Sequence, residues 1–452
     1  MARHSSIHGQ WSGRLAFILA ATGSAVGLGN IWKFPYITGA NGGGAFVIVY
    51  LLCIAAIGLP IMMAEVMLGR RGRQSPINTM RELAREEGAH PLWKYVGWLG
   101  VIAGFLILSY YSVIAGWALS YVFRTAGGAF TGITAEGADR VFGGLVSDPE
   151  RLLAWHTIFM VLTMVVVARG VQSGLEQAVR YLMPALFALL LLLVGYAMAE
   201  GEFAAGLAFM FTPDFGKLTG DAVLIAMGQA FFTLSLGMGA IMMYGSYLPE
   251  RTSISRTSFA VAASDTLVAI LAGIAIFPIV FANGLEPSSG PGLIFKTLPL
   301  AFGAMPGGAF FGTLFFLLLV FAAWTSAISI IEPVVAWLVE NHGHTRVAAS
   351  VWAGLVTWLV GLGTVLSFNL WSSPLAFGKT FFDLIDYLTS NIMLPLGGVL
   401  IALFAGWFMS ERAVREEMDM QHPWLYRLWY FLLRFVTPIC VIAVFLKAIN
   451  VI

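Results

Sequence analysis

The chain of 452 residues is 59% hydrophobic and only 11% charged, whereas a soluble domain carries about 25% charged residues. This composition excludes an ordinary soluble protein and predicts a polytopic protein of the lipid bilayer. The net charge of +1 gives no basis for nucleic-acid binding. Cys53 and Cys440 both lie in apolar segments, so neither a disulfide nor a metal site is expected from them.

Eleven apolar segments are long enough to cross a bilayer, which takes about 20 helical residues. They cover residues 13–37, 44–69, 92–123, 152–169, 175–199, 222–248, 257–283, 308–339, 347–367, 381–409 and 424–449. With the N-terminus inside, sixteen lysines and arginines lie on its side and seven on the other. The positive-inside rule therefore predicts a cytoplasmic N-terminus and an external C-terminus. Two outer loops, about 124–151 and 284–307, are rich in Gly and Pro and suit lids over an outer vestibule.

Three glycines and an asparagine interrupt the first apolar segment: Gly23, Gly27, Gly29 and Asn30. Each glycine weakens a helix by about 1 kcal/mol relative to alanine, and an unwound backbone inside a bilayer is tolerated only beside a polar cavity. Close helix packing through small residues is the alternative interpretation. Three glycines within seven residues favour a binding site made of unwound backbone.

The sixth segment carries a matching interruption at Gly237 and Gly239. The two interrupted segments are the first and the sixth, five places apart in the order of segments, so they would be equivalent members of two five-helix repeats. Because five is odd, the repeats would be inverted in the membrane. Paired, glycine-broken helices in corresponding positions indicate the binding site of a secondary transporter.

The sequence Ser24-Ala-Val-Gly-Leu-Gly-Asn-Ile-Trp-Lys-Phe-Pro35, followed by Asn41-Gly-Gly-Gly-Ala-Phe46, resembles the first-helix signature of the neurotransmitter:sodium symporter family. The sixth segment and Thr325-Ser326 are similar too, and the similarity runs from Trp11 to about Trp407. The resemblance implies an all-α leucine-transporter fold and sodium-coupled uptake of amino acids or amines. Many members have twelve helices; eleven are predicted here, as in some bacterial members. The absence of Asn-x-Ser/Thr sites agrees with the plasma membrane of a bacterium.

This resemblance divides the chain into five parts. They are a cytoplasmic N-terminal latch (1–12), a first five-helix repeat (13–199), an extracellular loop (200–221), a second five-helix repeat (222–411), and an eleventh transmembrane helix with the C-terminus (412–452). The repeats are spans 1–5 and 6–10, with spans 1 and 6 unwound in the middle of the membrane.

The resemblance also implies two sodium sites made of hard oxygen ligands. The first would combine the carbonyl of Ala25 with Asn30, Thr233, Asp265 and the substrate carboxylate. The second would combine the carbonyls of Gly23, Val26 and Ala322 with the hydroxyls of Thr325 and Ser326. A substrate that donates a ligand to the first ion couples the two bindings, since each raises the affinity of the other by the same factor. Taken alone, the two hydroxyls are explained equally by hydrogen bonds to carbonyls one turn earlier.

Asp265 departs from the family pattern, which usually has asparagine at this position of the first sodium site. A carboxylate inside an apolar span is costly and indicates a function. The alternative interpretation is a helix-start carboxylate near Arg251 and Arg256. Animal relatives use chloride to balance the sodium charge. Asp265 can supply that negative charge itself, so chloride-independent transport is predicted.

The polar end of the predicted substrate site suits an amino acid. Helix N-termini at the breaks favour a carboxylate, and the resemblance adds the hydroxyl of Tyr111. Amine-transporting relatives carry an aspartate early in the first break, where this chain has Gly27. A zwitterionic α-amino acid is therefore predicted, with its ammonium group met by the carbonyls of Ala25 and Phe232 and by Ser235.

The other end of the site is expected to be apolar, which favours a hydrophobic L-amino acid. Met238 replaces a phenylalanine of the leucine-transporting relative, and methionine is adaptable, so bulky or aromatic side chains are expected to fit. The alternative is that Met238 only fills the core. The predicted substrate-binding set is Ser24, Ala25, Gly29, Ile107, Tyr111, Phe232, Thr233, Ser235, Met238, Ser326 and Ile330. Glu65 is expected to accept N–H groups that the unwound sixth span leaves free, a structural role.

Gates are expected above and below the site. Lys33 and Asp386 stand where the family has an arginine–aspartate pair, and lysine lacks the planar fork of arginine, so a looser outer gate is predicted. Phe232 would form the apolar lid beneath it. The inner latch is predicted from Trp11, Ser246, Tyr247 and Glu340. His8 replaces the N-terminal arginine of the family, which raises a hypothesis of pH-sensitive inward opening.

Other functions remain as alternatives at this point. A proton-coupled amino-acid transporter is the nearest one, and a non-transporting amino-acid sensor of the same fold would need the same pocket. An enzyme is not expected, because the spans hold neither a His-Glu-x-x-His motif nor a Ser/His/Asp set.

Overall fold

The computed structural model describes residues 7–287 and 292–448, and this part of the chain is helical, with no β-strand. The first half contains α1 (Arg14–Ala25), α2 (Phe34–Ala40), α3 (Gly44–Cys53), α4 (Leu59–Gly72), α5 (Pro76–Glu86), α6 (Lys94–Ala126), α7 (Ala135–Val146), α8 (Pro149–Ala168), α9 (Gln177–Glu200) and α10 (Phe203–Phe211). The second half contains α11 (Gly220–Thr233), α12 (Ala240–Ser246), α13 (Ile254–Ala282), α14 (Leu298–Ala304), α15 (Gly308–His342), α16 (Arg346–Ser367), α17 (Phe381–Asp386), α18 (Leu394–Leu403), α19 (Glu411–Met418), α20 (Pro423–Phe431) and α21 (Thr437–Ala448). Short π-helical turns continue several of them, so that α3 with α4, α17 with α18, and α20 with α21 form single long rods.

Within the described residues, nine continuous helices are long and apolar enough to cross a membrane. They are Gly44–Gly72, Pro91–Ala126, Pro149–Ala168, Val171–Glu200, Ile254–Ala282, Gly308–His342, Arg346–Ser367, Phe381–Phe408 and Pro423–Lys447. The first predicted span is the pair Arg14–Ala25 and Gly29–Ala40, bent by 52° at its break. The sixth is divided into α11 and α12. Each of the eleven predicted spans therefore corresponds to a helix or a broken helix pair.

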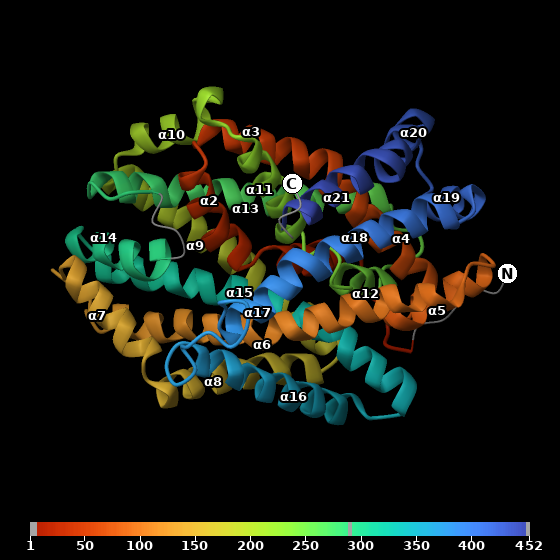
Figure 1. Cartoon of the computed structure of the whole chain (residues 1–452), viewed down its shortest axis with the longest axis horizontal. Coiled ribbons are helices and arrows are strands. Elements are labelled where there is room, and N and C mark those ends of the chain that lie inside the picture. Colours follow the sequence, from red (N-terminus) through yellow and green to blue (C-terminus); the bar gives the residue numbers. More distant parts are fainter. Residues whose placement is uncertain (1–6, 288–291, 449–452) are drawn as a thin grey trace.

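The helices form one elongated bundle (Figure 1). The N-terminal end of the chain lies with α5, α19 and α20 at one end of it, and α7, α10 and α14 lie at the other. Inside the bundle, α6 packs along α15, α13 packs along α9, and α4 packs against α12. The last contact requires glycine, because a Cβ added at Gly69 would lie 1.8 Å from the carbonyl oxygen of Met242.

The predicted loops contain short helices that the sequence analysis did not anticipate. The outer loop at 124–151 holds α7, the loop at 284–307 holds a helical segment over Leu293–Ala304, and the loop at 200–221 holds α10. These segments are short and interrupted by Gly and Pro, so helical periodicity in the sequence is weak. They give the far end of the bundle a structured rim.

Candidate substrate and sodium site

The two helix breaks lie against each other in the middle of the bundle. The hydroxyl of Ser235 donates a hydrogen bond of 2.8 Å to the carbonyl of Ser24, and the amide of Gln229 donates one of 2.9 Å to the carbonyl of Gly29. All four residues are buried. The unwound backbone of each break is thus stabilised by side chains of the other, as expected where no lipid can satisfy it.

The second break adopts left-handed backbone that favours glycine. Gly237 and Gly239 have φ values of 80° and 77°, and Ser235 has a φ of 54°. The N–H of Gly237 donates to Oε1 of Glu65 at 2.7 Å. The prediction that Glu65 accepts an N–H group freed by this break is confirmed.

The side chains predicted for the first sodium site meet in one buried cluster. The amide of Asn30 donates to Oδ1 of Asp265 at 2.7 Å, and the hydroxyl of Thr233 donates to Oδ2 at 3.1 Å. The side-chain oxygen of Asn30 accepts the N–H of Gly27 at 3.0 Å, inside the first break. Asp265 is 0% exposed, so the helix-start alternative is wrong. One carboxylate among neutral oxygens is a set of hard ligands that suits Na⁺.

The residues predicted for the second site join α1 to α15. A Cβ added at Gly23 would lie 3.2 Å from Cβ of Thr325. The hydroxyl of Thr325 donates to the carbonyls of Ala322 and Phe321, both at 3.1 Å. This is the within-helix bonding that the sequence analysis left as an alternative. It leaves the lone pairs of the hydroxyl available to a cation.

The polar part of the predicted substrate site centres on Tyr111, which α6 brings to the first break. Its hydroxyl accepts the N–H of Leu28 at 3.3 Å. A Cβ added at Gly27 would lie 2.8 Å from that hydroxyl oxygen and 3.3 Å from Oγ of Ser326. Glycine at position 27 therefore lets the tyrosine and α15 approach the unwound backbone more closely than any side chain would allow.

The apolar part lies where α6 faces α15 and the second break. Ile107, Met238 and Ile330 are buried, with 2%, 3% and 2% of their surface exposed. A Cβ added at Gly104 would lie 3.2 Å from the carbonyl oxygen of Ile330 and 3.3 Å from that of Met238. The predicted apolar residues are thus drawn from three elements to one place.

On the side of the site opposite the N-terminal segment, the predicted Lys33–Asp386 pair is not formed. Within the described residues, the ammonium group of Lys33 lies 4.3 Å above the ring of Phe232, and Asp386 instead accepts the hydroxyl of Ser390 at 3.0 Å. A lysine ammonium group above an aromatic ring makes a favourable cation–π contact. A looser outer gate than an arginine–aspartate pair stays a prediction.

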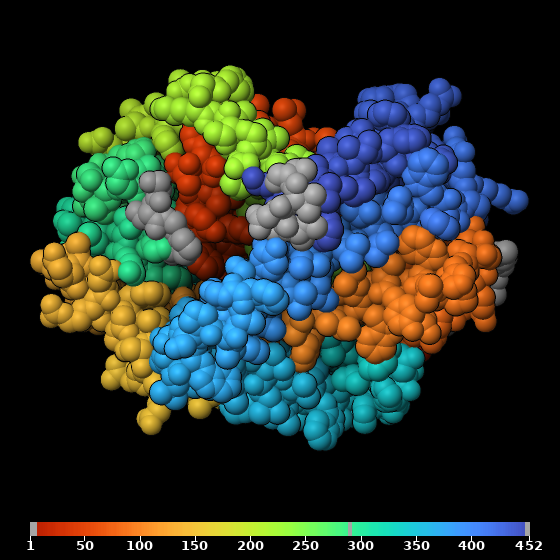
Figure 2. All heavy atoms as spheres, viewed as in Figure 1, coloured from red at the N-terminus to blue at the C-terminus, as the bar shows by residue number. Residues whose placement is uncertain are grey.

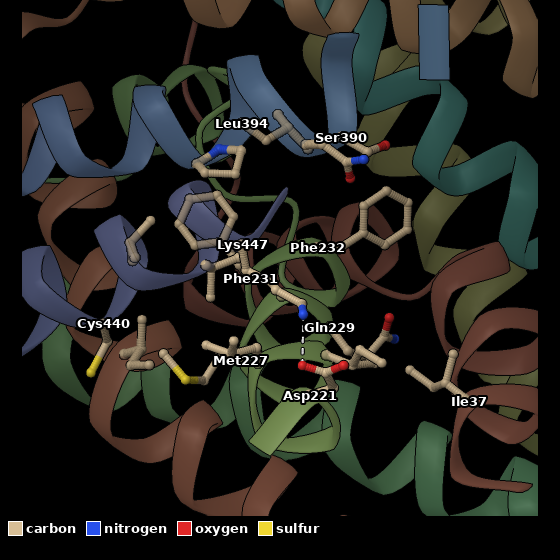
Figure 3. Close-up of a pocket in the computed structure, with 18 of the residues that line it drawn as sticks. Ile37, Asp221, Met227, Gln229, Phe231, Phe232, Ser390, Leu394, Cys440 and Lys447 are labelled. Atoms are coloured by element: carbon tan, nitrogen blue, oxygen red, sulfur yellow. Dashed lines mark ion pairs between the residues drawn. The ribbon is translucent and has the colours of Figure 1, made fainter. Parts of the chain in front are cut away.

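A cavity of about 310 Å³ lies beside this gate. Phe232, Ser390 and Gln229 point toward it, and Lys447 of α21 forms an ion pair of 2.7 Å with Asp221 of α11 across it (Figure 3). On the face drawn in Figure 2, red N-terminal segments are visible at the bottom of a hollow between green and blue helices.

The N-terminal segment contacts the residues predicted for the inner latch. Trp11 donates its backbone N–H to the carbonyl of Tyr247 at 3.0 Å and its indole N–H to the carbonyl of Tyr244 at 3.1 Å. Glu340 lies 2.9 Å from Nε2 of His8. The hydroxyl of Ser246 bonds within its own helix to the carbonyl of Met243 at 2.7 Å, and its part in the latch stays a prediction.

Further residues of this closure were missed. Glu340 also accepts the N–H of Ser75 at 2.7 Å, the hydroxyl of Ser75, and the amide of Asn78 at 2.7 Å. Glu332 accepts the hydroxyl of Tyr247 at 2.6 Å and pairs with Arg346 at 2.5 Å. A carboxylate inside an apolar span was the available signal for Glu332.

The profile of the Sodium:neurotransmitter symporter family matches residues 8–131 and 146–452. The chain belongs to this family. A sodium-dependent transporter of Bacillus subtilis, YhdH, is 40% identical over 98% of both chains. A sodium-dependent transporter of Haemophilus influenzae is 33% identical over 97% of both chains. This symporter is therefore a sodium-coupled, multi-pass membrane transporter and not an enzyme.

The fold of this symporter is also that of a solved relative. The crystal structure of MhsT in complex with L-phenylalanine superposes with a TM-score of 0.89 at 45% sequence identity, covering 97% of this chain and 99% of that one. Two broken helix pairs, α1 with α2 and α11 with α12, agree with this likeness. Together they assign the leucine-transporter fold with its two inverted repeats.

Proposed function

We propose that this symporter imports hydrophobic L-amino acids, including bulky and aromatic ones, together with two sodium ions and without chloride. The observation that carries the proposal is the missing side chain at Gly27, where a Cβ would lie only 2.8 Å from the hydroxyl oxygen of Tyr111 and 3.3 Å from that of Ser326. An aspartate there would suit an amine. With glycine, the first break carries no carboxylate to pair with an amine or to repel a substrate carboxylate, which the helix N-termini at the breaks favour.

Sodium coupling follows if the substrate carboxylate completes the first ion site. Asn30, Thr233 and Asp265 supply oxygens from three helical elements. A carboxylate held at the first break would add one more to the same ion. Neither ligand then binds at full affinity without the other, and the coupling acts equally in both directions.

The substrate class is supported by the apolar residues and by the relative. Ile107, Met238 and Ile330 offer no polar group to a substrate side chain, and a flexible methionine adapts to different shapes. MhsT has been crystallised with L-phenylalanine. This relative and the apolar residues together support phenylalanine-like substrates for this chain.

The gates support alternating access in the plasma membrane of a bacterium, with the N-terminus in the cytoplasm. The N-terminal segment closes one side through contacts of Trp11 with Tyr247 and of His8 with Glu340, while on the other side the described residues place Lys33 over Phe232 beside a cavity. A thick inner barrier and a thin outer one suit a transporter that loads from outside.

Reconstitution in proteoliposomes tests the function. We expect an inward sodium gradient to drive uptake of L-phenylalanine and L-leucine, and a proton gradient without sodium to drive none. Uptake driven by protons alone would replace this proposal with the proton-coupled transporter. Sodium-dependent binding without any uptake would indicate the amino-acid sensor. L-serine, which is small and polar, is the matched control substrate and is expected to be transported poorly.

Chloride replacement tests the role of Asp265. Exchanging chloride for gluconate on both sides of the vesicle membrane is expected to leave the initial uptake rate unchanged, because the carboxylate already balances one sodium charge. Uptake is measured with radiolabelled L-phenylalanine at fixed sodium. A large loss of rate in gluconate would contradict chloride independence.

The His8 contact predicts a pH-dependent inner latch. Imidazole changes charge near neutral pH, and a protonated His8 forms a charge-assisted hydrogen bond with Glu340. If this contact depends on pH, inward accessibility is expected to differ between pH 6 and pH 8. It is measured by labelling an introduced cysteine in the inner pathway of a variant without Cys53 and Cys440. His8→Arg should give a flat profile, and identical profiles for the two proteins would contradict the hypothesis.

A further inference from the structure

A second cavity, of about 580 Å³, lies away from the substrate site, between the start of α1, the α3–α4 rod, the start of α13, and α20. Its walls are mostly apolar and include Leu59, Met63, Leu425 and Trp429. The indole of Trp429 donates to the carbonyl of Pro60 at 3.2 Å and so fixes α20 against α4. A volume of this size is in the range of pockets that hold small ligands.

Two arginines stand in the lining of this cavity, Arg14 at the first position of α1 and Arg256 near the start of α13. No acidic side chain lines it. Arg256 donates to the neutral side chain of Gln421 at 2.8 Å. Arg14 has no hydrogen bond or ion pair with residues 7–287 or 292–448. The cavity therefore carries two positive charges that the described part of the protein does not balance.

The surroundings of the cavity are those of a surface that meets lipid. Phe259 and Leu428, both in its lining, are 63% and 47% exposed. In a membrane protein such side chains face acyl chains. The cavity lies toward the end of the bundle where the N-terminal segment, α19 and α20 are found (Figure 1). The arginines are thus placed to bind a lipid headgroup, and the apolar wall is placed to contact an acyl chain.

We propose that this cavity binds one anionic phospholipid, with its phosphate between Arg14 and Arg256 and one acyl chain along Phe259, Leu428 and Trp429. Guanidinium groups bind phosphate through paired N–H groups, and basic pockets between transmembrane helices recognise acidic headgroups. A lipid held in this way joins the first half of the broken helix to α13. It stabilises the arrangement in which α1 is docked in the bundle.

The test uses the full chain purified in a neutral detergent. Phosphatidylglycerol is titrated against phosphatidylcholine with the same acyl chains, and the unfolding temperature and bound lipid are measured by a thermal melt and native mass spectrometry. A ligand that binds only the folded state raises the unfolding temperature. We expect phosphatidylglycerol to raise it and phosphatidylcholine to leave it unchanged.

Variants separate this site from general attraction to the membrane. Arg14→Gln/Arg256→Gln is expected to raise the half-saturating concentration of phosphatidylglycerol at least tenfold. Arg412→Gln/Arg427→Gln makes the same charge change on exposed positions outside the cavity and is expected to leave it unchanged. Ala260→Phe keeps both arginines and fills the cavity. It is also expected to raise the half-saturating concentration of phosphatidylglycerol.

Four outcomes would overturn the proposal. If phosphatidylcholine raised the unfolding temperature as much as phosphatidylglycerol, the arginines would not recognise the headgroup. If inorganic phosphate raised it as much, the apolar wall would not contribute to binding. If the Arg412→Gln/Arg427→Gln control lost as much affinity for phosphatidylglycerol, the lipid would be attracted by positive charge in general and not by this cavity. Unchanged lipid binding in Ala260→Phe would place the lipid elsewhere. All of these readouts are binding measurements, so they are independent of which amino acid is transported.

Discussion

Replacing Asp265 with asparagine is expected to weaken sodium-dependent substrate binding by about 30-fold or more. Asp265 is the one carboxylate among the side chains predicted for the first ion site, and it is fully buried. Removing one partner of a buried, hydrogen-bonded charge interaction costs about 2–5 kcal/mol, and each 1.4 kcal/mol is a factor of about ten in affinity. The measurement is the sodium dependence of L-phenylalanine binding to purified protein.

Two features make this test specific. Because the coupling between ligands is reciprocal, the same variant should lose apparent affinity for the amino acid at fixed sodium by a similar factor. Asp139→Asn is the matched control. Its carboxylate is 60% exposed and pairs with Lys296 at 2.8 Å far from the site, so no effect is expected. A normal sodium dependence in Asp265→Asn would show that this carboxylate does not contact the ion.

Replacing Gly27 with alanine is expected to reduce amino-acid binding while the protein still folds. The added methyl group would lie 2.8 Å from the hydroxyl oxygen of Tyr111, closer than any ordinary contact, and 3.3 Å from Ser326. Overpacking of this kind costs about 1–3 kcal/mol, which corresponds to about a 5- to 150-fold loss of substrate affinity.

Binding of radiolabelled substrate in detergent measures this loss directly. Gly195→Ala is the control, because a Cβ at Gly195 meets no atom within 4 Å. Equal substrate affinity in the two alanine variants would show that the close packing of Tyr111 against Gly27 does not shape the substrate site. Loss of folding in Gly27→Ala is detected separately from its elution profile and thermal melt.

Much of the fold could be predicted because its main signals are local. The glycines near Asn30 and those around Met238 break two apolar segments, and a broken helix in a bilayer has few possible surroundings. The partner of the second break, Glu65, was also predictable, since a carboxylate within an apolar span needs donors and the break supplies them.

The parts that could not be predicted depend on contacts between distant segments. Glu332 and Arg346 lie in different helices, and their meeting with Tyr247 follows from the packing of α12, α15 and α16. Whether Lys33 would lie over Phe232 or reach Asp386 depends on the relative positions of the three helical elements that carry them. The short helices of the outer loops lack a long periodic pattern, so their sequences resemble irregular loops.

The environment of Glu340 determines how the inner closure responds to salt. Three of its four donors, two from Ser75 and one from Asn78, carry no net charge, and the fourth is the imidazole of His8. Mobile ions weaken attraction between separated surface charges, over a Debye length of about 8 Å at physiological ionic strength. They have little effect on neutral hydrogen bonds at contact distance. The hydrogen bonds of Glu340 are therefore expected to keep their strength as ionic strength changes, so that sodium would act on the transport cycle by binding and not by screening these contacts.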